Sequence, residues 1–172
     1  MTEQEFRAVY PLIIGWIQNT LAQHAPAARA VSELGFKRLP QFYQASTLAT
    51  AKVVVVPKVP APLLTKLGLT RFIEFESMDM DGVTYLDTYF VRTDHADRES
   101  LHFHELVHVI QWRLLGPERF LALYADGLER FGYRHSPLEE MAYGFQDAFD
   151  HGAQPFDVEA ACRAQLGTLA AG

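Results

Sequence analysis

Apolar side chains recur every three to four residues along much of the chain, which is the spacing of helices that bury one face. The first such stretch covers residues 2–24, with Thr2 as a capping candidate and with Pro11 either kinking the helix or starting a second one. Glycine or proline residues stand near the ends of the other stretches, as expected at helix boundaries. These further helices are expected at residues 25–34, 63–67, 101–115, 117–131, 137–147 and 157–170.

Two segments have the patterns of strands. Residues 53–56 are consecutive valines, which predict a short strand that is buried on both faces. From residue 71 to residue 91 the side chains alternate between two faces, and Asp81 and Gly82 lie in the middle of this stretch. We therefore expect a hairpin with the Asp-Gly pair in its turn. Together the segments predict a mostly helical α+β fold with a small sheet.

The length of 172 residues suits a single domain with a substantial core. Apolar residues make up 49% of the chain and charged residues 21%, an ordinary globular composition that argues against disorder. Within this single domain, residues 1–172, we expect a helical N-terminal region at residues 1–50, a catalytic core at 51–150 and a C-terminal helix within 151–172.

The formal net charge of −6 is not offset by any basic cluster, so neither nucleic acid nor a membrane surface is an expected partner. The start of the chain lacks the positive flank of a secretory signal, and the apolar run at residues 10–17 is too short to cross a bilayer. The single cysteine, Cys162, cannot form an intrachain disulfide, which agrees with a reducing compartment. We therefore expect a soluble, cytoplasmic protein.

The candidate chemistry lies in the helix expected at residues 101–115, which contains the pattern His-Glu-x-x-His. His104 and His108 are about one helical turn apart, so both imidazoles can reach one ion, and Glu105 lies beside them. This set suits catalytic zinc, which lowers the pKa of water to about 7 while the carboxylate accepts its proton. The alternative is an amphipathic helix whose histidines bind no metal, but the helical periodicity and the Gly-Pro stop favour the metal site.

A catalytic zinc site needs a third protein ligand. His102 lies on the opposite side of the helix from the motif ligands, and His95 lies in a loop of undefined position. A further histidine at the His-x-x-Gly-x-x-His spacing is absent. Glu139 and Glu140 remain, at the start of a later helix, and the residues alone leave both open because a capping box with Ser136 would occupy Glu139.

With these features, residues 71–150 resemble a gluzincin, a zincin-like metallopeptidase in which a glutamate from a downstream helix completes a His-Glu-x-x-His site. The resemblance rests on His-Glu-Leu-x-His-Val-x-Gln at residues 104–111 and on Pro-x-Glu-x-x-Ala at residues 137–142. It implies a zincin-like fold that binds Zn²⁺. The residues that it implies are the zinc ligands His104, His108 and Glu139, and the catalytic carboxylate Glu105.

The chain departs from this pattern at Tyr143, where many relatives have an aspartate that supports a ligand histidine. We expect that support to come instead from the Tyr143 hydroxyl, from Asp147 or from a backbone carbonyl. The resemblance places the third ligand at Glu139, and Ala142, close to the same helix face, would allow the two helices to approach. Glu139 is therefore favoured over Glu140.

The resemblance implies a peptidase, whose substrate is a peptide or a protein. The strand before the motif helix, at residues 83–91, would lie at a sheet edge where an extended peptide can pair with it. Tyr133, Arg134 and His135, on the loop before the second glutamate helix, are candidates to stabilise an oxyanion. The alternative is a zinc-binding module without turnover, but a purely structural site has no need of a base such as Glu105.

Overall fold

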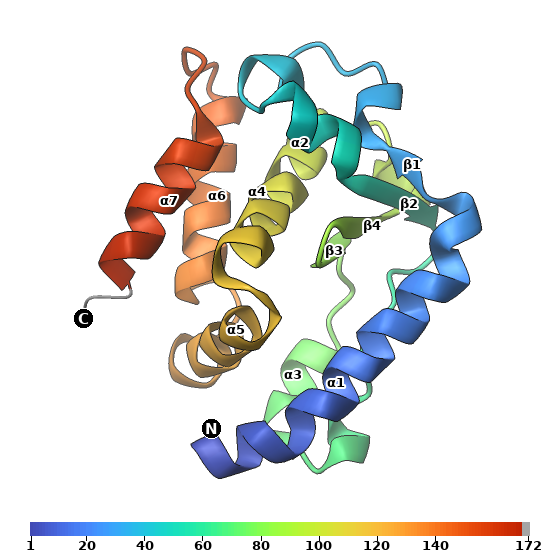
Figure 1. Ribbon diagram of the computed structural model, residues 1–172, viewed down its shortest axis with the longest axis vertical. Helices are drawn as coiled ribbons and strands as arrows, with labels where there is room; N and C mark the ends of the chain where they lie inside the picture. Colours follow the sequence, from blue (N-terminus) through green and yellow to red (C-terminus); the bar gives the residue numbers. More distant parts are fainter. Residues whose placement is uncertain (170–172) are drawn as a thin grey trace.

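The computed structural model describes residues 1–169 and has a small sheet surrounded by helices (Figure 1). The mostly helical α+β class expected from the sequence is confirmed. No helix in the described part of the chain is both long enough and apolar enough to cross a membrane. The helices are α1 (Glu3–His24), α2 (Ala45–Thr50), α3 (Ile73–Glu76), α4 (Glu99–Leu115), α5 (Pro117–Phe131), α6 (Pro137–Asp150) and α7 (Val158–Leu169), and the strands are β1 (Arg29–Ala30), β2 (Lys52–Val56), β3 (Gly82–Tyr85) and β4 (Thr88–Arg92).

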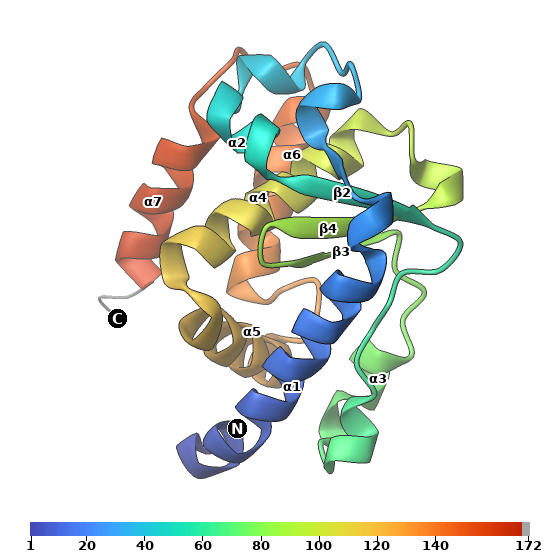
Figure 2. The ribbon, with the colours of Figure 1, turned by 45° about the vertical axis from the view of Figure 1, so that its right-hand side comes forward.

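The strands are ordered β1-β2-β4-β3 across the sheet. β2 and β4 run parallel, whereas β1 and β3 are antiparallel to their neighbours, so the sheet is mixed. Helix α4 lies between the sheet and the pair α6 and α7, as Figures 1 and 2 show, and it packs against β3, β4, α5, α6 and α7. This central position explains why the whole segment from Leu101 to Trp112 is buried.

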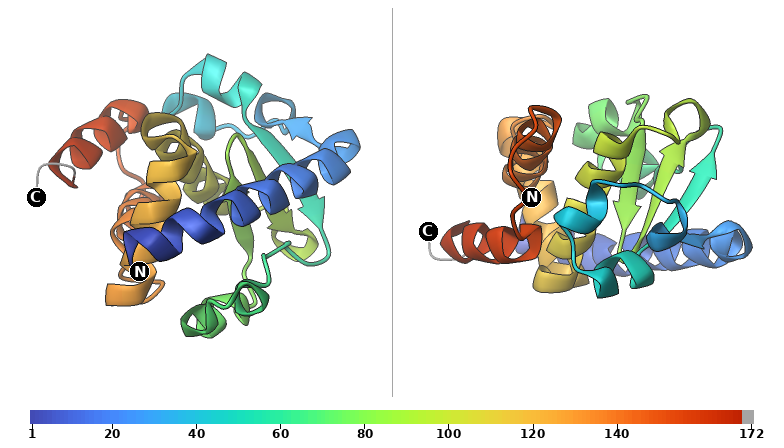
Figure 3. Two further views of the ribbon diagram at one scale, coloured as in Figure 1. Left: turned by 60° about the horizontal axis from the view of Figure 1, so that its bottom comes forward. Right: turned by 90° about the horizontal axis from the view of Figure 1, so that it is seen from above.

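The alternation of side chains along β3 and β4 separates two layers. On one face, Tyr85 and Phe90 contact Trp16 and His24 of α1, which crosses the sheet in Figure 3. The opposite face is directed towards α4, where Thr84 and Tyr89 bond to side chains of that helix. The period of two along these strands therefore places Thr84 next to the motif helix.

The hairpin was only partly predicted. Residues 71–76, expected as its first strand, form a 3-10 turn at Thr70–Phe72 followed by α3, because Phe72 and Phe75 are three residues apart and pack together towards the core. The hairpin joins β3 to β4 through Leu86 and Asp87, and the Asp81-Gly82 pair lies at the start of β3 instead of in the turn. The Asp81 carboxylate pairs with Arg92, which anchors this acidic loop to β4.

The N-terminal third also differs from the expectation. Residues 25–34 do not form a helix: two 3-10 turns flank the short strand β1, which pairs with β2. Helix α1 continues through Pro11 as one element. In β2, Val55 is 47% exposed although Val53, on the same face of the strand, is buried, so the prediction of burial on both faces is wrong at Val55.

Candidate metal centre

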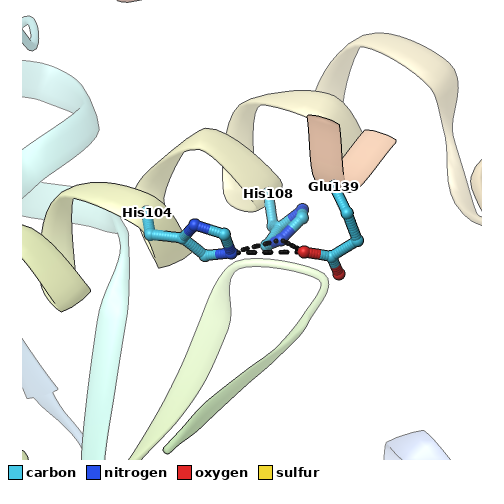
Figure 4. Close-up of side chains that lie close together, drawn as sticks. All are labelled: His104, His108 and Glu139. Carbon is cyan, nitrogen blue, oxygen red and sulfur yellow. Dashed lines mark hydrogen bonds and ion pairs between the residues drawn. The ribbon is translucent and has the colours of Figure 1, made fainter. Parts of the chain in front are cut away.

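The three ligands expected from the sequence lie together in the interior, as Figure 4 shows. His104 and His108 project from α4, and Glu139 projects towards them from the first turn of α6. Their exposed fractions are only 3%, 5% and 1%. Helix α4 thus supplies two ligands from one face, and its packing against α6 brings the third within reach.

The distances among the ligand atoms suit a small metal ion. The Nε2 atoms of His104 and His108 are 3.1 Å apart, and each lies 3.4 Å from Oε2 of Glu139. Tetrahedral coordination with bonds of about 2.0–2.2 Å places ligand atoms about 3.3–3.6 Å apart, which the two distances to Glu139 match and the distance between the imidazoles approaches. Glu139 Oε2 is buried and has no hydrogen-bond partner among the described residues, as expected for an atom that faces a cation. The group could therefore hold a metal ion.

A buried glutamine sets the tautomer of His108. Gln111 Nε2 donates to the Leu138 carbonyl oxygen at 3.0 Å, which leaves Gln111 Oε1 facing His108 Nδ1 at 2.8 Å. Because that oxygen can only accept, Nδ1 carries the hydrogen, and Nε2 is the nitrogen that faces the other two side chains. Gln111 is fully buried, so the geometry is fixed by the packing of α4 against α6. Such an outer hydrogen bond is typical of metal-ligating histidines.

The electrostatics of the cluster favour a cation. Burial raises the pKa of Glu139, but the adjacent imidazoles of His108 and His104 outweigh it and hold this pKa well below its ordinary value. Burial lowers the pKa of His108, whereas the Glu139 carboxylate raises it to a net value of about 9. The ionised carboxylate thus favours positive charge at the His108 imidazole, which a proton or a metal ion can supply.

Glu139, rather than Glu140, belongs to this group. Its Oε1 accepts a hydrogen bond of 2.6 Å from the Tyr124 hydroxyl on α5, which orients the carboxylate. The capping-box interpretation is wrong, because neither side chain makes the bond: α6 has no side-chain cap, and the Ser136 hydroxyl is buried without a partner among the described residues. Glu140 is exposed and pairs with His135.

Support for His104 differs from the expectation. Its Nδ1 is buried and has no hydrogen-bond partner in the described part of the chain, so neither Tyr143 nor Asp147 bonds to it. The Tyr143 ring instead packs against the imidazole, with ring centroids 4.5 Å apart, and Arg134 stacks on the outer face of that ring. Packing, instead of a hydrogen bond, therefore orients His104.

Glu105 is held on the side of α4 that faces the sheet. Its Oε2 accepts a hydrogen bond of 2.6 Å from the Thr84 hydroxyl on β3. The Gly82 backbone also approaches it closely: a Cβ at that position would lie 2.9 Å from Glu105 Cδ, closer than van der Waals contact. Burial raises the pKa of Glu105 above its ordinary value. The carboxylate is therefore positioned beside the ligands without joining the group.

The three candidates for oxyanion stabilisation, on the loop before α6, lie in different environments. Tyr133 is half-buried and, like Glu105, lines an apolar cavity beside the ligand group. Burial raises the pKa of the Tyr133 phenol, so its hydroxyl stays a hydrogen-bond donor. His135 is exposed and its Nδ1 lies 3.3 Å from Glu140 Oε1, directed away from the buried group. Arg134 stacks on Tyr143. Of the three, the position of Tyr133 alone suits a contact with a substrate.

The residues that orient the motif side chains were not predicted from the sequence. Gln111 follows His108 by three residues, a helical spacing that could have signalled the contact. Tyr124 lies among the apolar residues of its helix, so the sequence pattern gives it no polar role. Thr84 and Gly82 lie more than twenty residues before Glu105, where no local pattern indicates the contact.

The chain matches no model of a known protein family, no curated protein and no solved structure.

Proposed function

We propose that the protein is a zinc-dependent peptidase of the gluzincin type, with a zincin-like arrangement around α4. The observation that carries the proposal is the buried His104–His108–Glu139 group at tetrahedral spacing, with a separate carboxylate beside it. A metal ion that only staples two helices requires the three ligands but gives no reason for Glu105 to be held in place by Thr84.

In this proposal His104, His108 and Glu139 hold the ion. A zinc ion held there would supply a water molecule of lowered pKa and a polarised substrate carbonyl. Glu105 accepts the proton of the attacking water and donates it to the leaving amine, and the Thr84 hydroxyl keeps its carboxylate in position. The Tyr133 hydroxyl is the candidate to donate a hydrogen bond to the carbonyl oxygen as negative charge develops there.

The sheet offers a way to bind the peptide. β3 is an edge strand that pairs only with β4, whereas β4 is internal, so the edge expected from the sequence is β3 alone. β3 also carries Gly82 and Thr84, which touch Glu105. An extended peptide that pairs with this edge would lie across the candidate base, which is why we favour a peptide substrate.

Hydrolysis of a peptide mixture, followed by mass spectrometry, tests the proposal. The zinc-loaded protein should cleave peptides, and Glu105→Gln should lower the rate by about 10²–10⁴-fold while keeping the metal, because it removes a base and not a ligand. Glu140→Gln is the matched control and should keep full activity, since Glu140 is exposed. No cleavage by the zinc-loaded protein, or equal cleavage by Glu105→Gln, would instead support the zinc-binding module.

A further inference from the structure

An apolar cavity of about 100 Å³ adjoins the candidate metal centre. Its walls come from α1, from the segment around Leu64 and Phe72, from β3 and from α5. Part of this lining, including Ile13, Ile17 and Leu64, lies outside the part of the chain that carries the gluzincin resemblance. Representative apolar lining residues are Ile13, Ile17, Leu64, Phe72, Leu121 and Leu128.

The charged groups on the cavity wall are those of the proposed chemistry. Among the described side chains that line it, the acidic and basic ones are Glu105, His108 and Glu139. Tyr124 and Tyr133 add hydroxyl groups at the same wall. A group bound in the cavity is therefore surrounded by apolar side chains on most sides and meets the candidate base and two metal ligands on the remaining side.

A second hollow, with a polar lining, lies on the other side of Glu105. Asp79, Asp81 and Arg98 contribute to it, together with His104. Gly82, Glu105 and Tyr133 border both hollows, so the candidate base and the candidate oxyanion donor lie between an apolar and a polar site. A substrate that extends across Glu105 thus meets an apolar environment on one side of this residue and a polar environment on the other.

We infer that the cavity binds one bulky apolar side chain of the substrate, of the size of leucine or phenylalanine, next to the bond that is cleaved. The inference rests on the proposed function. An apolar cavity of about 150 Å³ accommodates benzene, so this somewhat smaller but partly open cavity suits one branched aliphatic or aromatic group and not a long acyl chain. Water in such an apolar space lacks partners, so the side chain displaces it favourably.

Ala125→Leu on α5 fills the cavity and tests the inference, because Ala125 lines it without contacting a ligand. The readout is kcat/KM for peptides that differ at one position, with alanine, leucine, phenylalanine or aspartate. The unchanged protein should prefer leucine or phenylalanine over alanine by about 10–100-fold. Ala125→Leu should remove this preference while still cleaving the alanine peptide. Ala122→Leu is the matched control, since Ala122 lines a separate surface hollow on the same helix.

Leu121→Ala provides an independent variant in case Ala125→Leu fails to fold. It enlarges the cavity and should shift the preference from leucine towards phenylalanine and tryptophan. Cleavage without any preference for apolar side chains, or a preference that both cavity variants leave unchanged, overturns the inference but leaves the proposed function standing. Failure of the zinc-loaded protein to cleave any of the peptides overturns the proposed function and the inference with it.

Discussion

At the scale of single residues, the candidate site depends on hydrogen bonds from side chains that are not ligands. Gln111 fixes the tautomer of His108, and Tyr124 orients Glu139. The Gln111 bond is buried and the Tyr124 bond is partly buried, so the loss of one partner leaves a polar group without compensation. The position of each ligand is therefore determined by the packing of α4, α5 and α6 as much as by the motif itself.

Gln111→Leu should lower zinc affinity by about 10–100-fold, because His108 Nδ1 loses the acceptor that fixes its tautomer. A competition titration against a chelator of known affinity measures the effect. Gln146→Leu is the matched control. Gln146 is also buried, but it bonds to Asp150 rather than to a ligand, so the zinc affinity of this variant should equal that of the unchanged protein. Equal affinities of the two variants would contradict the role assigned to Gln111.

Gly82→Ala should lower peptide hydrolysis at least about tenfold while keeping zinc, because the new Cβ collides with the Glu105 carboxylate. Forcing this side chain aside should also destabilise the protein by about 1–3 kcal/mol in a denaturant titration. The control Gly144→Ala lies in α6, where a Cβ meets nothing within 4 Å. That variant should be neutral or more stable by about 0.5–1 kcal/mol, since alanine favours helix.

The residues of the candidate centre were predictable to different degrees. The ligands on α4 follow from a local spacing of four residues, and Glu139 required the resemblance because Ser136 made the capping box an equally good local interpretation. In the structure Glu139 lies next to the two imidazoles, whereas the exposed Glu140 pairs with His135. Contacts between distant segments, such as Thr84 with Glu105, have no local signal and emerge only from the fold.

At the scale of secondary structure, helix periodicity predicted the long helices well and the sheet poorly. α4, α5 and α6 begin or end at glycine or proline residues, which the sequence displays directly. The segment at residues 71–76 alternates like a strand, but tertiary packing of Phe72 and Phe75 makes it helical. Alternation over so few residues does not separate a strand from a short helix, whereas the long helices repeat their pattern over several turns.

The start of α4 is anchored to the N-terminal region by one carboxylate. Glu99 Oε1 accepts hydrogen bonds from the backbone amides of Arg38 and Leu39, at 2.8 Å and 3.0 Å. Glu99→Ala should destabilise the protein by about 1–3 kcal/mol, because it leaves partly buried donors unpaired. Glu118→Ala, at the exposed start of α5, should cost no more than about 0.3–1 kcal/mol through the helix dipole. Both variants are compared by denaturant titration. Equal losses in the free energy of unfolding would contradict the anchoring role of Glu99.

At the scale of the whole molecule, the layers bring the candidate site together. The sheet supplies Thr84, which binds Glu105, to one side of α4, and α6 supplies Glu139 to another side. The complete candidate site therefore forms only when the sheet, α4 and α6 are packed together (Figures 1 and 4). A metal ion bound to the folded chain and not to the unfolded one would stabilise this arrangement. Binding of such an ion and formation of the fold would therefore be coupled.

The most direct test of this account is the zinc content of the purified protein and of two variants, measured by elemental analysis after incubation with zinc and removal of the excess. The account predicts one zinc ion per chain in the unchanged protein and in Glu140→Gln, and a substantial loss in Glu139→Gln, whose carboxylate lies 3.4 Å from both imidazoles. A protein that takes up no zinc at micromolar concentrations, or a loss in Glu140→Gln with full retention in Glu139→Gln, would contradict it.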